Sequence, residues 1–184
     1  LMAVTQQRTA HDLTGPADAP VVVLIHGLGL NRDVTWRALA PALAERFRVL
    51  TYDLPGHGET ALPEGPVTLT ALSAHLIALL DALEIPRAAL VGFSLGGMIN
   101  RRCAMDHPGR VTALAILNSP HERDPQAQAL VEARARDTSE GGPGATIDAT
   151  LERWFTAEFR KENSEVVDEV RAVVMANDHG NYAA

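Results

Sequence analysis

Four short apolar runs separated by helix-like patterns constrain the fold of this 184-residue chain more than any other feature. The first run, VVVLIH at residues 21–26, is continuously apolar and is bounded by Pro20 and Gly27, as is typical of a strand buried on both faces. The other three are RVLTYD (48–53), AALVGF (88–93) and VTALAILN (111–118). Strands that alternate with helices predict an α/β fold with a mostly parallel sheet flanked by helices.

The segments between these runs carry apolar residues at helical spacing. Thr68 is a suitable N-cap for one predicted helix, and Pro86 follows its end. A second helix is predicted from Leu95 to Asp106, because Pro108 stops any continuation. The apolar stripe of the first helix consists of Leu69, Leu72, Leu76, Leu79 and Leu83.

The character of the chain changes after Ser119. Residues 121–145 are rich in charge, Gly and Pro, and GGPG at 141–144 predicts a flexible break. We therefore divide the chain into a core portion, residues 1–119, and a helical cap segment, residues 120–184, of the kind that covers a site. The predicted cap helices carry the aromatic residues Trp154, Phe155 and Phe159.

Composition and charge exclude several classes of function. A formal net charge of −7, with no run of Lys and Arg, argues against a nucleic-acid partner. The single cysteine, Cys103, cannot form an internal disulfide. Neither a secretory signal nor a membrane span is recognisable, so we expect a cytoplasmic protein and assign no membrane partner. Leu1, which precedes Met2, is left out of the functional interpretation.

A serine between glycines is the strongest chemical motif. G-F-S-L-G at 92–96 follows a predicted buried strand and opens a predicted helix, which is the context of a nucleophile elbow. Ser94 is therefore the candidate nucleophile. The backbone N–H of Leu95, at the start of the helix, is a candidate donor to an oxyanion.

A second oxyanion donor is expected from HGLG at 26–29, directly after the first apolar run. The glycines there let the backbone turn and expose the N–H of Leu28. We expect His26 and Gly27 to border the substrate on this side. On the cap side, Trp154 and Phe155 are expected to shape an apolar pocket for a small acyl group.

Three motifs together, HGLG (26–29), YDLPGHGET (52–60) and GFSLGGM (92–98), resemble the α/β-hydrolase superfamily in order and spacing. Within it, ERWFTAEF (152–159) and the final NYAA are similar to 3-oxoadipate enol-lactonases and related carboxylesterases. The resemblance implies two strands before residue 21 and makes the four apolar runs strands three to six. It also implies that the catalytic acid follows strand seven and the histidine follows strand eight, and that both strands are absent from this chain.

No histidine of the chain is favoured as the missing base. The resemblance gives His26 a loop-packing role and His57 a turn role. His11, His107 and His75, the last expected on the solvent side of its helix, are interpreted as structural. Two histidines of this chain stay open as substitutes for the catalytic base: His121 just past the last strand, and His179 in the cap.

Candidate acids are equally limited. Glu122 and Asp124 follow the strand of 111–118, where a rarer early acid would lie, although Asn118 occupies its tip. Asp53 is interpreted as fixing the PGHG turn. Because the strand of 111–118 would leave an apolar edge unpaired, we expect a second polypeptide carrying the acid and the histidine to dock there.

These features predict a serine hydrolase that cleaves a small carboxylic ester or enol-lactone through an acyl-enzyme. Two other classes stay open: a ligand-binding protein without turnover, and acyl transfer, carbon–carbon hydrolysis or perhydrolysis at the same site. Dehalogenase chemistry is disfavoured, since it needs Asp where Ser94 stands. No cofactor is expected: metal-ligand spacings are absent, and Arg32 breaks the dinucleotide pattern in GLGLN.

Overall fold

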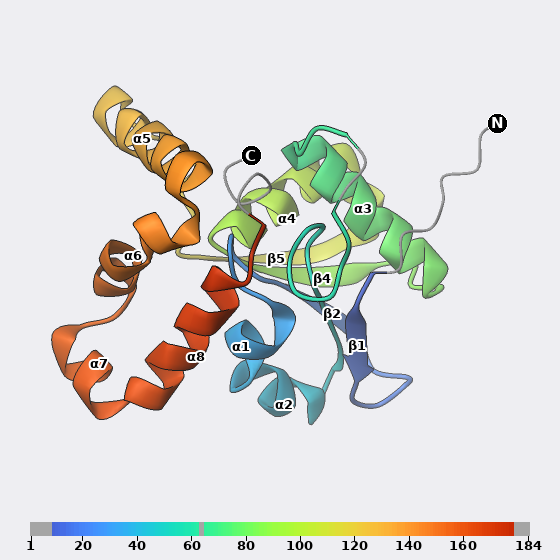
Figure 1. Cartoon of the computed structure of the whole chain (residues 1–184). Helices are drawn as coiled ribbons and strands as arrows, with labels where there is room; N and C mark the ends of the chain where they lie inside the picture. The colour runs from blue at the N-terminus through green and yellow to red at the C-terminus, as the bar shows by residue number, and fades with distance from the viewer. Residues whose placement is uncertain (1–8, 63–64, 179–184) are drawn as a thin grey trace.

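A single five-stranded sheet forms the centre of the computed structural model, which describes residues 9–62 and 65–178. The strand order is β1-β3-β2-β4-β5, with β1 antiparallel to β3 and the other pairs parallel. The mostly parallel α/β sheet is thereby confirmed (Figure 1). The strands are β1 (His11–Thr14), β2 (Val21–Ile25), β3 (Arg48–Tyr52), β4 (Ala88–Phe93) and β5 (Val111–Leu117).

The four strands predicted from the apolar runs are confirmed, and one further expected strand is not tested. Each of the four apolar runs is a strand, and three of these strands end one residue before their run does. Of the two strands expected before residue 21, the structure describes β1. A second one would fall on residues 1–8, which lie outside the described residues.

Helices cover both faces of the sheet, which explains why β2 is apolar at every position. Val23 and Ile25 face a core shared with α3 and α4, whereas Val22 and Leu24 face a second cluster that contains Trp36 of α1. The expected cap of α3 is present, since Thr68 Oγ1 accepts a hydrogen bond from Ala71 N (3.1 Å). These helices are α1 (Arg32–Trp36), α2 (Leu39–Ala44), α3 (Leu69–Ala82) and α4 (Leu95–Asp106).

One burial prediction was wrong. His75 was expected on the solvent side of its helix, but it is half-buried. Its ring stacks on Tyr52 at a centroid distance of 6.4 Å, and its Nε2 lies 3.0 Å from Thr9 Oγ1. The aromatic surface of Tyr52 supplies the apolar partner that helical spacing alone did not indicate.

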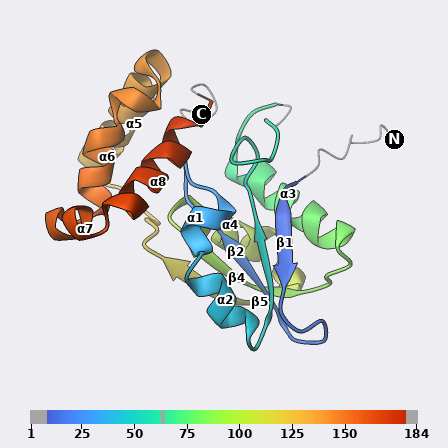
Figure 2. The same cartoon turned by 60° about the horizontal axis from the view of Figure 1, so that its bottom comes forward.

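The described part of residues 120–184 forms helices, and most of residues 121–145 form one long helix. Its Pro and Gly residues lie at its ends, where Pro125 begins the helix and Gly142 follows it with φ of 73°. This helix, α5, extends away from the sheet, whereas α8 lies beside α1 (Figures 1 and 2). The cap elements are α5 (Pro125–Gly141), η2 (Pro143–Ala145), α6 (Ile147–Trp154), α7 (Ala157–Glu162) and α8 (Ser164–Met175).

A third apolar cluster joins the cap to the sheet. Leu30, in the loop after β2, belongs to the same buried cluster as residues of α6 and α8. The cap members of that cluster are Ile147, Leu151, Val167, Val170 and Val174. Within the described ranges, no helix has both the length and the apolar character that crossing a bilayer demands.

Candidate active site

Ser94 lies at a sharp turn between β4 and α4, at the carboxyl end of the strand. Its backbone has φ 51° and ψ −113°, a conformation that non-glycine residues rarely adopt and that costs on the order of 1–3 kcal/mol. Its N–H donates to Leu117 O (2.9 Å), which ties the turn to the end of β5. Ser94 is partly exposed.

The glycines of the motif are required because the strand and the helix approach each other closely. A Cβ at Gly92 would lie 2.2 Å from the carbonyl oxygen of Gly96. A Cβ at Gly96 would lie 2.1 Å from the carbonyl oxygen of Ile25, and one at Gly97 would lie 2.5 Å from Ser119 Cβ. Since backbone atoms cannot give way at such distances, only glycine fits at 92 and 96, as the sequence predicts.

The loop after β2, residues 26–30, lies against this turn and is called the oxyanion loop below. Leu30 N–H donates to Gly27 O (3.3 Å), and Gly29 has φ 77°, as a type II turn requires. A Cβ at Gly27 would lie 3.3 Å from Ser94 Cβ, so the loop and the nucleophile turn are in close contact.

Two backbone donors are available at this contact. Leu95 is the first residue of α4, and its N–H therefore has no acceptor within the helix. Leu28 is the second residue of the loop's turn, and no acceptor for its N–H is found in the part of the chain that the structure describes. Leu28 is also 38% exposed.

His26 anchors the first end of the oxyanion loop. Leu54 N–H donates to its Nε2 (3.0 Å), so the ring proton is on Nδ1 and donates to Gly27 O (2.8 Å). Complete burial, with a contribution from His57, lowers the pKa of His26 to about 3. Because both ring nitrogens are engaged and the side chain is inaccessible, we correct His26 from a substrate-binding to a loop-positioning residue.

Asp53 anchors the second end of the same loop. Its Oδ1 accepts from Arg32 N (2.8 Å), its Oδ2 accepts from Glu59 N (3.0 Å), and the Arg32 guanidinium pairs with the buried carboxylate. A Cβ at Gly58 would lie 2.2 Å from Asp53 Oδ2, so the turn fits only with glycine there. The prediction that Asp53 fixes the PGHG turn is confirmed, and the carboxylate also holds Arg32, the second residue after the oxyanion loop.

His57 lies next to His26, the first residue of the oxyanion loop. Its ring centroid is 5.3 Å from that of His26, and its Nδ1 bonds Pro55 O (3.1 Å). Burial lowers its pKa, which favours the neutral ring. The turn role expected for His57 therefore agrees with its contacts.

On the cap side, the expected aromatic residues differ in burial. Phe155 packs against the cluster that contains Leu30 and stacks on Phe159 at 5.2 Å between centroids. Phe93, directly before Ser94, packs against the same cluster. Trp154 is 37% exposed. Phe93 was not among the predicted site residues, although it directly precedes Ser94 in the sequence.

Among the described residues, no catalytic base is found beside Ser94. The side chain of His121 is 80% exposed and lies 3.8 Å from Glu122, and no hydrogen bond joins any described histidine to Ser94 Oγ. Asp124 serves instead as the N-cap of α5, accepting from Ala127 N (2.7 Å). His179 lies outside the described residues. Nor do the described residues include a cluster of three or more potential metal ligands.

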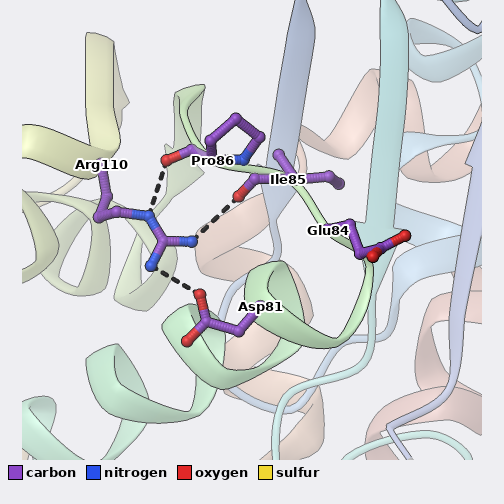
Figure 3. A pocket seen from close by; sticks show the side chains of 5 residues that line it. All are labelled: Asp81, Glu84, Ile85, Pro86 and Arg110. Carbon is purple, nitrogen blue, oxygen red and sulfur yellow. Dashed lines mark hydrogen bonds and ion pairs between the residues drawn. The ribbon is translucent and has the colours of Figure 1, made fainter.

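A separate hollow lies at the opposite, amino-terminal end of β4 (Figure 3). Arg110 fills its centre, donating to Pro86 O (2.7 Å) and Ile85 O (3.0 Å) and pairing with Asp81 (2.7 Å). Ligands of parallel sheets bind at the carboxyl ends of the strands. The hollow therefore has a structural explanation and is distinct from the site at Ser94.

Comparison with known proteins agrees with this geometry. A family model described as alpha/beta hydrolase fold matches residues 20–151. The chain is 31% identical to 3-oxoadipate enol-lactonase 2 of Acinetobacter baylyi over 170 residues, which are 92% of this chain and 62% of that protein. The chain thus spans less than two thirds of this relative's length.

Solved structures with the same fold are also similar. An enol-lactonase from Burkholderia xenovorans superposes with a TM-score of 0.85 and 32% identity, covering 95% of this chain and 67% of that one. A thermophilic esterase from Thermogutta terrifontis superposes with a TM-score of 0.86 and 26% identity, covering 96% and 64%.

Proposed function

Because the chain belongs to the alpha/beta hydrolase fold family, we propose that it carries the nucleophile and the oxyanion hole of a serine hydrolase. The proposed substrates are small carboxylic esters or enol-lactones. The observation that carries this proposal is the contact between Ser94, strained at φ 51°, and the loop that presents Leu28 N–H. The named lactonase and esterase relatives support the substrate class.

In the proposed reaction, Ser94 Oγ attacks the substrate carbonyl carbon while its proton passes to a base. The carbonyl oxygen becomes negative, and the N–H groups of Leu28 and Leu95 stabilise it. The tetrahedral intermediate expels the alkoxide or enolate, which takes up a proton, and leaves an acyl group on Ser94. Water then releases the acid and restores the hydroxyl.

The base and the acid of this mechanism are proposed to lie outside the described residues, on a segment that pairs with β5. β5 is an edge strand of the described sheet, and its apolar side chains Leu114 and Ile116 are 40% and 42% exposed. Such an edge favours another strand as its partner. Intact-mass analysis of the active protein tests this part of the proposal. An active sample that contains a 19.7 kDa species and no other polypeptide would contradict it.

Covalent labelling together with hydrolysis tests the proposed function. A fluorophosphonate probe should label Ser94 in the whole protein, and Ser94→Ala should abolish both labelling and the hydrolysis of p-nitrophenyl acetate. Ser139→Ala, which changes an exposed serine of α5, is the matched control and should keep both. Hydrolysis that survives in the Ser94 variant would reject the proposal, and ligand binding without turnover would favour a non-catalytic role.

A further inference from the structure

Asn177, just beyond the end of α8, contacts the oxyanion loop. Its Nδ2 lies 2.9 Å from the carbonyl oxygen of Gly29, which is 148 residues away in the sequence. The same nitrogen lies 3.1 Å from Val173 O and 3.0 Å from Val174 O, at the carboxyl end of α8. One amide group therefore joins the end of a cap helix to the turn that carries Leu28.

The surroundings of Asn177 determine which end of its amide faces the loop. Carbonyl oxygens only accept hydrogen bonds, so three of them around one atom require the NH₂ group there and exclude the amide oxygen. The helix-terminal carbonyls of Val173 and Val174 hold the amide in place. Because the NH₂ group has only two hydrogens, Val173 O and Val174 O share one of them, and the other donates to Gly29 O.

Helix α8 packs against the oxyanion loop and pairs with a residue next to α1, and these contacts fix the position of Asn177. Val170 and Val174 are buried in the cluster that contains Leu30 of the loop. The Arg37 guanidinium, just after α1, pairs with Glu169 of α8. Both views of the molecule show α8 alongside α1, with its carboxyl end approaching the loop (Figures 1 and 2).

We propose that Asn177 is a positioning residue for the oxyanion hole, an inference that rests on the proposed function. Gly29 O and Leu28 N–H belong to one four-residue turn, so fixing the Gly29 carbonyl restricts rotation of the turn and of the Leu28 donor. A donor must lie within a few tenths of an ångström of its place to stabilise an oxyanion. The cap thereby sets the geometry of the reaction centre as well as covering it.

The test uses Asn177→Ala and Asn177→Asp in the whole protein, with p-nitrophenyl acetate as the substrate. We expect kcat to fall about 10- to 100-fold while KM stays within about 3-fold, because the substrate still binds and only the transition state loses its donor. The Asp variant has nearly the same shape, but its carboxylate would face three carbonyl oxygens, so its loss should be at least as large.

Asn163→Ala is the matched control. Its Nδ2 donates to Phe159 O (3.3 Å) at the end of α7, so the same change removes a helix-terminal contact that does not reach the loop. We expect its kcat to stay within about 2-fold of the unaltered protein. An equal loss of kcat in this variant would overturn the proposal.

Hydrogen exchange of the Leu30 amide, which closes the turn onto Gly27 O, provides a readout independent of activity. It should become at least about 10-fold faster in Asn177→Ala and stay unchanged in Asn163→Ala. Unchanged exchange in the Asn177 variant, or faster exchange with an unaltered kcat, would overturn the proposal. If the unaltered protein neither hydrolyses esters nor labels at Ser94, the proposed function has failed, and Leu30 exchange still decides whether Asn177 orders the loop.

Discussion

Gly96 is the residue at which the nucleophile turn tolerates least change. A Cβ there would lie 2.1 Å from the carbonyl oxygen of Ile25. We expect Gly96→Ala to lower the free energy of unfolding by more than about 3 kcal/mol, because strand and helix backbones must separate. Urea denaturation of the purified variant measures this change.

Gly109 offers the comparison for this substitution. No atom lies within 4 Å of the position that its Cβ would take, so Gly109→Ala should change the unfolding free energy by less than about 0.5 kcal/mol. Equal stability of the two variants would contradict the steric account of the G-x-S-x-G motif.

Sequence reasoning at the residue scale succeeded where a motif fixes the backbone. The elbow and its two glycines follow from the spacing of G-F-S-L-G, because the turn geometry dictates the residue types. For His26 the family resemblance implied the loop-packing role, whereas the position of His26 beside Gly27 also suggested a substrate contact. Its partner Leu54 N comes from a different loop, which motif spacing does not reveal. Asn177 was missed for the same reason: its acceptor Gly29 is distant in the sequence, and a lone Asn after a helix carries no distinct signal.

The turn of residues 53–60 contacts both ends of the oxyanion loop, through Leu54 N at His26 and through Asp53 at Arg32. Asp53 is 1% exposed and accepts hydrogen bonds from Arg32 N and Glu59 N. We expect Asp53→Asn to cost about 2–3 kcal/mol of unfolding free energy, because its NH₂ group would face a donor that then stays buried and unpaired. Chemical denaturation at pH 7 measures the cost.

Asp12→Asn is the matched variant for this turn. Asp12 pairs with the same Arg32 (2.7 Å), but its side chain is 54% exposed, so its loss should cost less than about 1 kcal/mol. A cost as large as that of Asp53→Asn would mean that the ion pair with Arg32, rather than the buried hydrogen bonds, stabilises the turn.

Elements of this chain were predictable where periodicity is strong. Strands β2 to β5 were located to within one residue, since helices on both faces of the sheet demand continuous apolar runs. No bounds were predicted for β1. The helix α5 was less evident, because its surface is exposed along most of its length and therefore lacks an apolar stripe. His75 was misplaced because the burial of a helix face depends on which aromatic side chain lies opposite.

The stability of the whole molecule should fall as the pH drops below neutrality. Burial lowers the pKa of His26, to about 3, and also the pKa values of His57 and His75. The unfolded chain binds protons at these groups below about pH 6.5, whereas the folded protein does not until the lower folded-state pKa is reached. The stabilisation is therefore complete above pH 6.5 and is lost as the pH falls toward those values.

Urea denaturation at pH 7 and pH 5 measures this effect. Between its folded and unfolded pKa values, each of the buried histidines His26 and His57 lowers the free energy of unfolding by up to about 1.4 kcal/mol per pH unit. The half-buried His75 contributes less, because solvent screens its charge. His75→Gln, far from the nucleophile, should make the dependence shallower. An equal free energy of unfolding at the two pH values would contradict the burial of neutral histidines.

The most direct measurement is a crystal structure of the whole protein after reaction with a fluorophosphonate. We predict phosphorus bonded to Ser94 Oγ and a phosphoryl oxygen about 2.7–3.1 Å from both Leu28 N and Leu95 N. An adduct on another residue, or a phosphoryl oxygen that neither N–H reaches, would contradict the account.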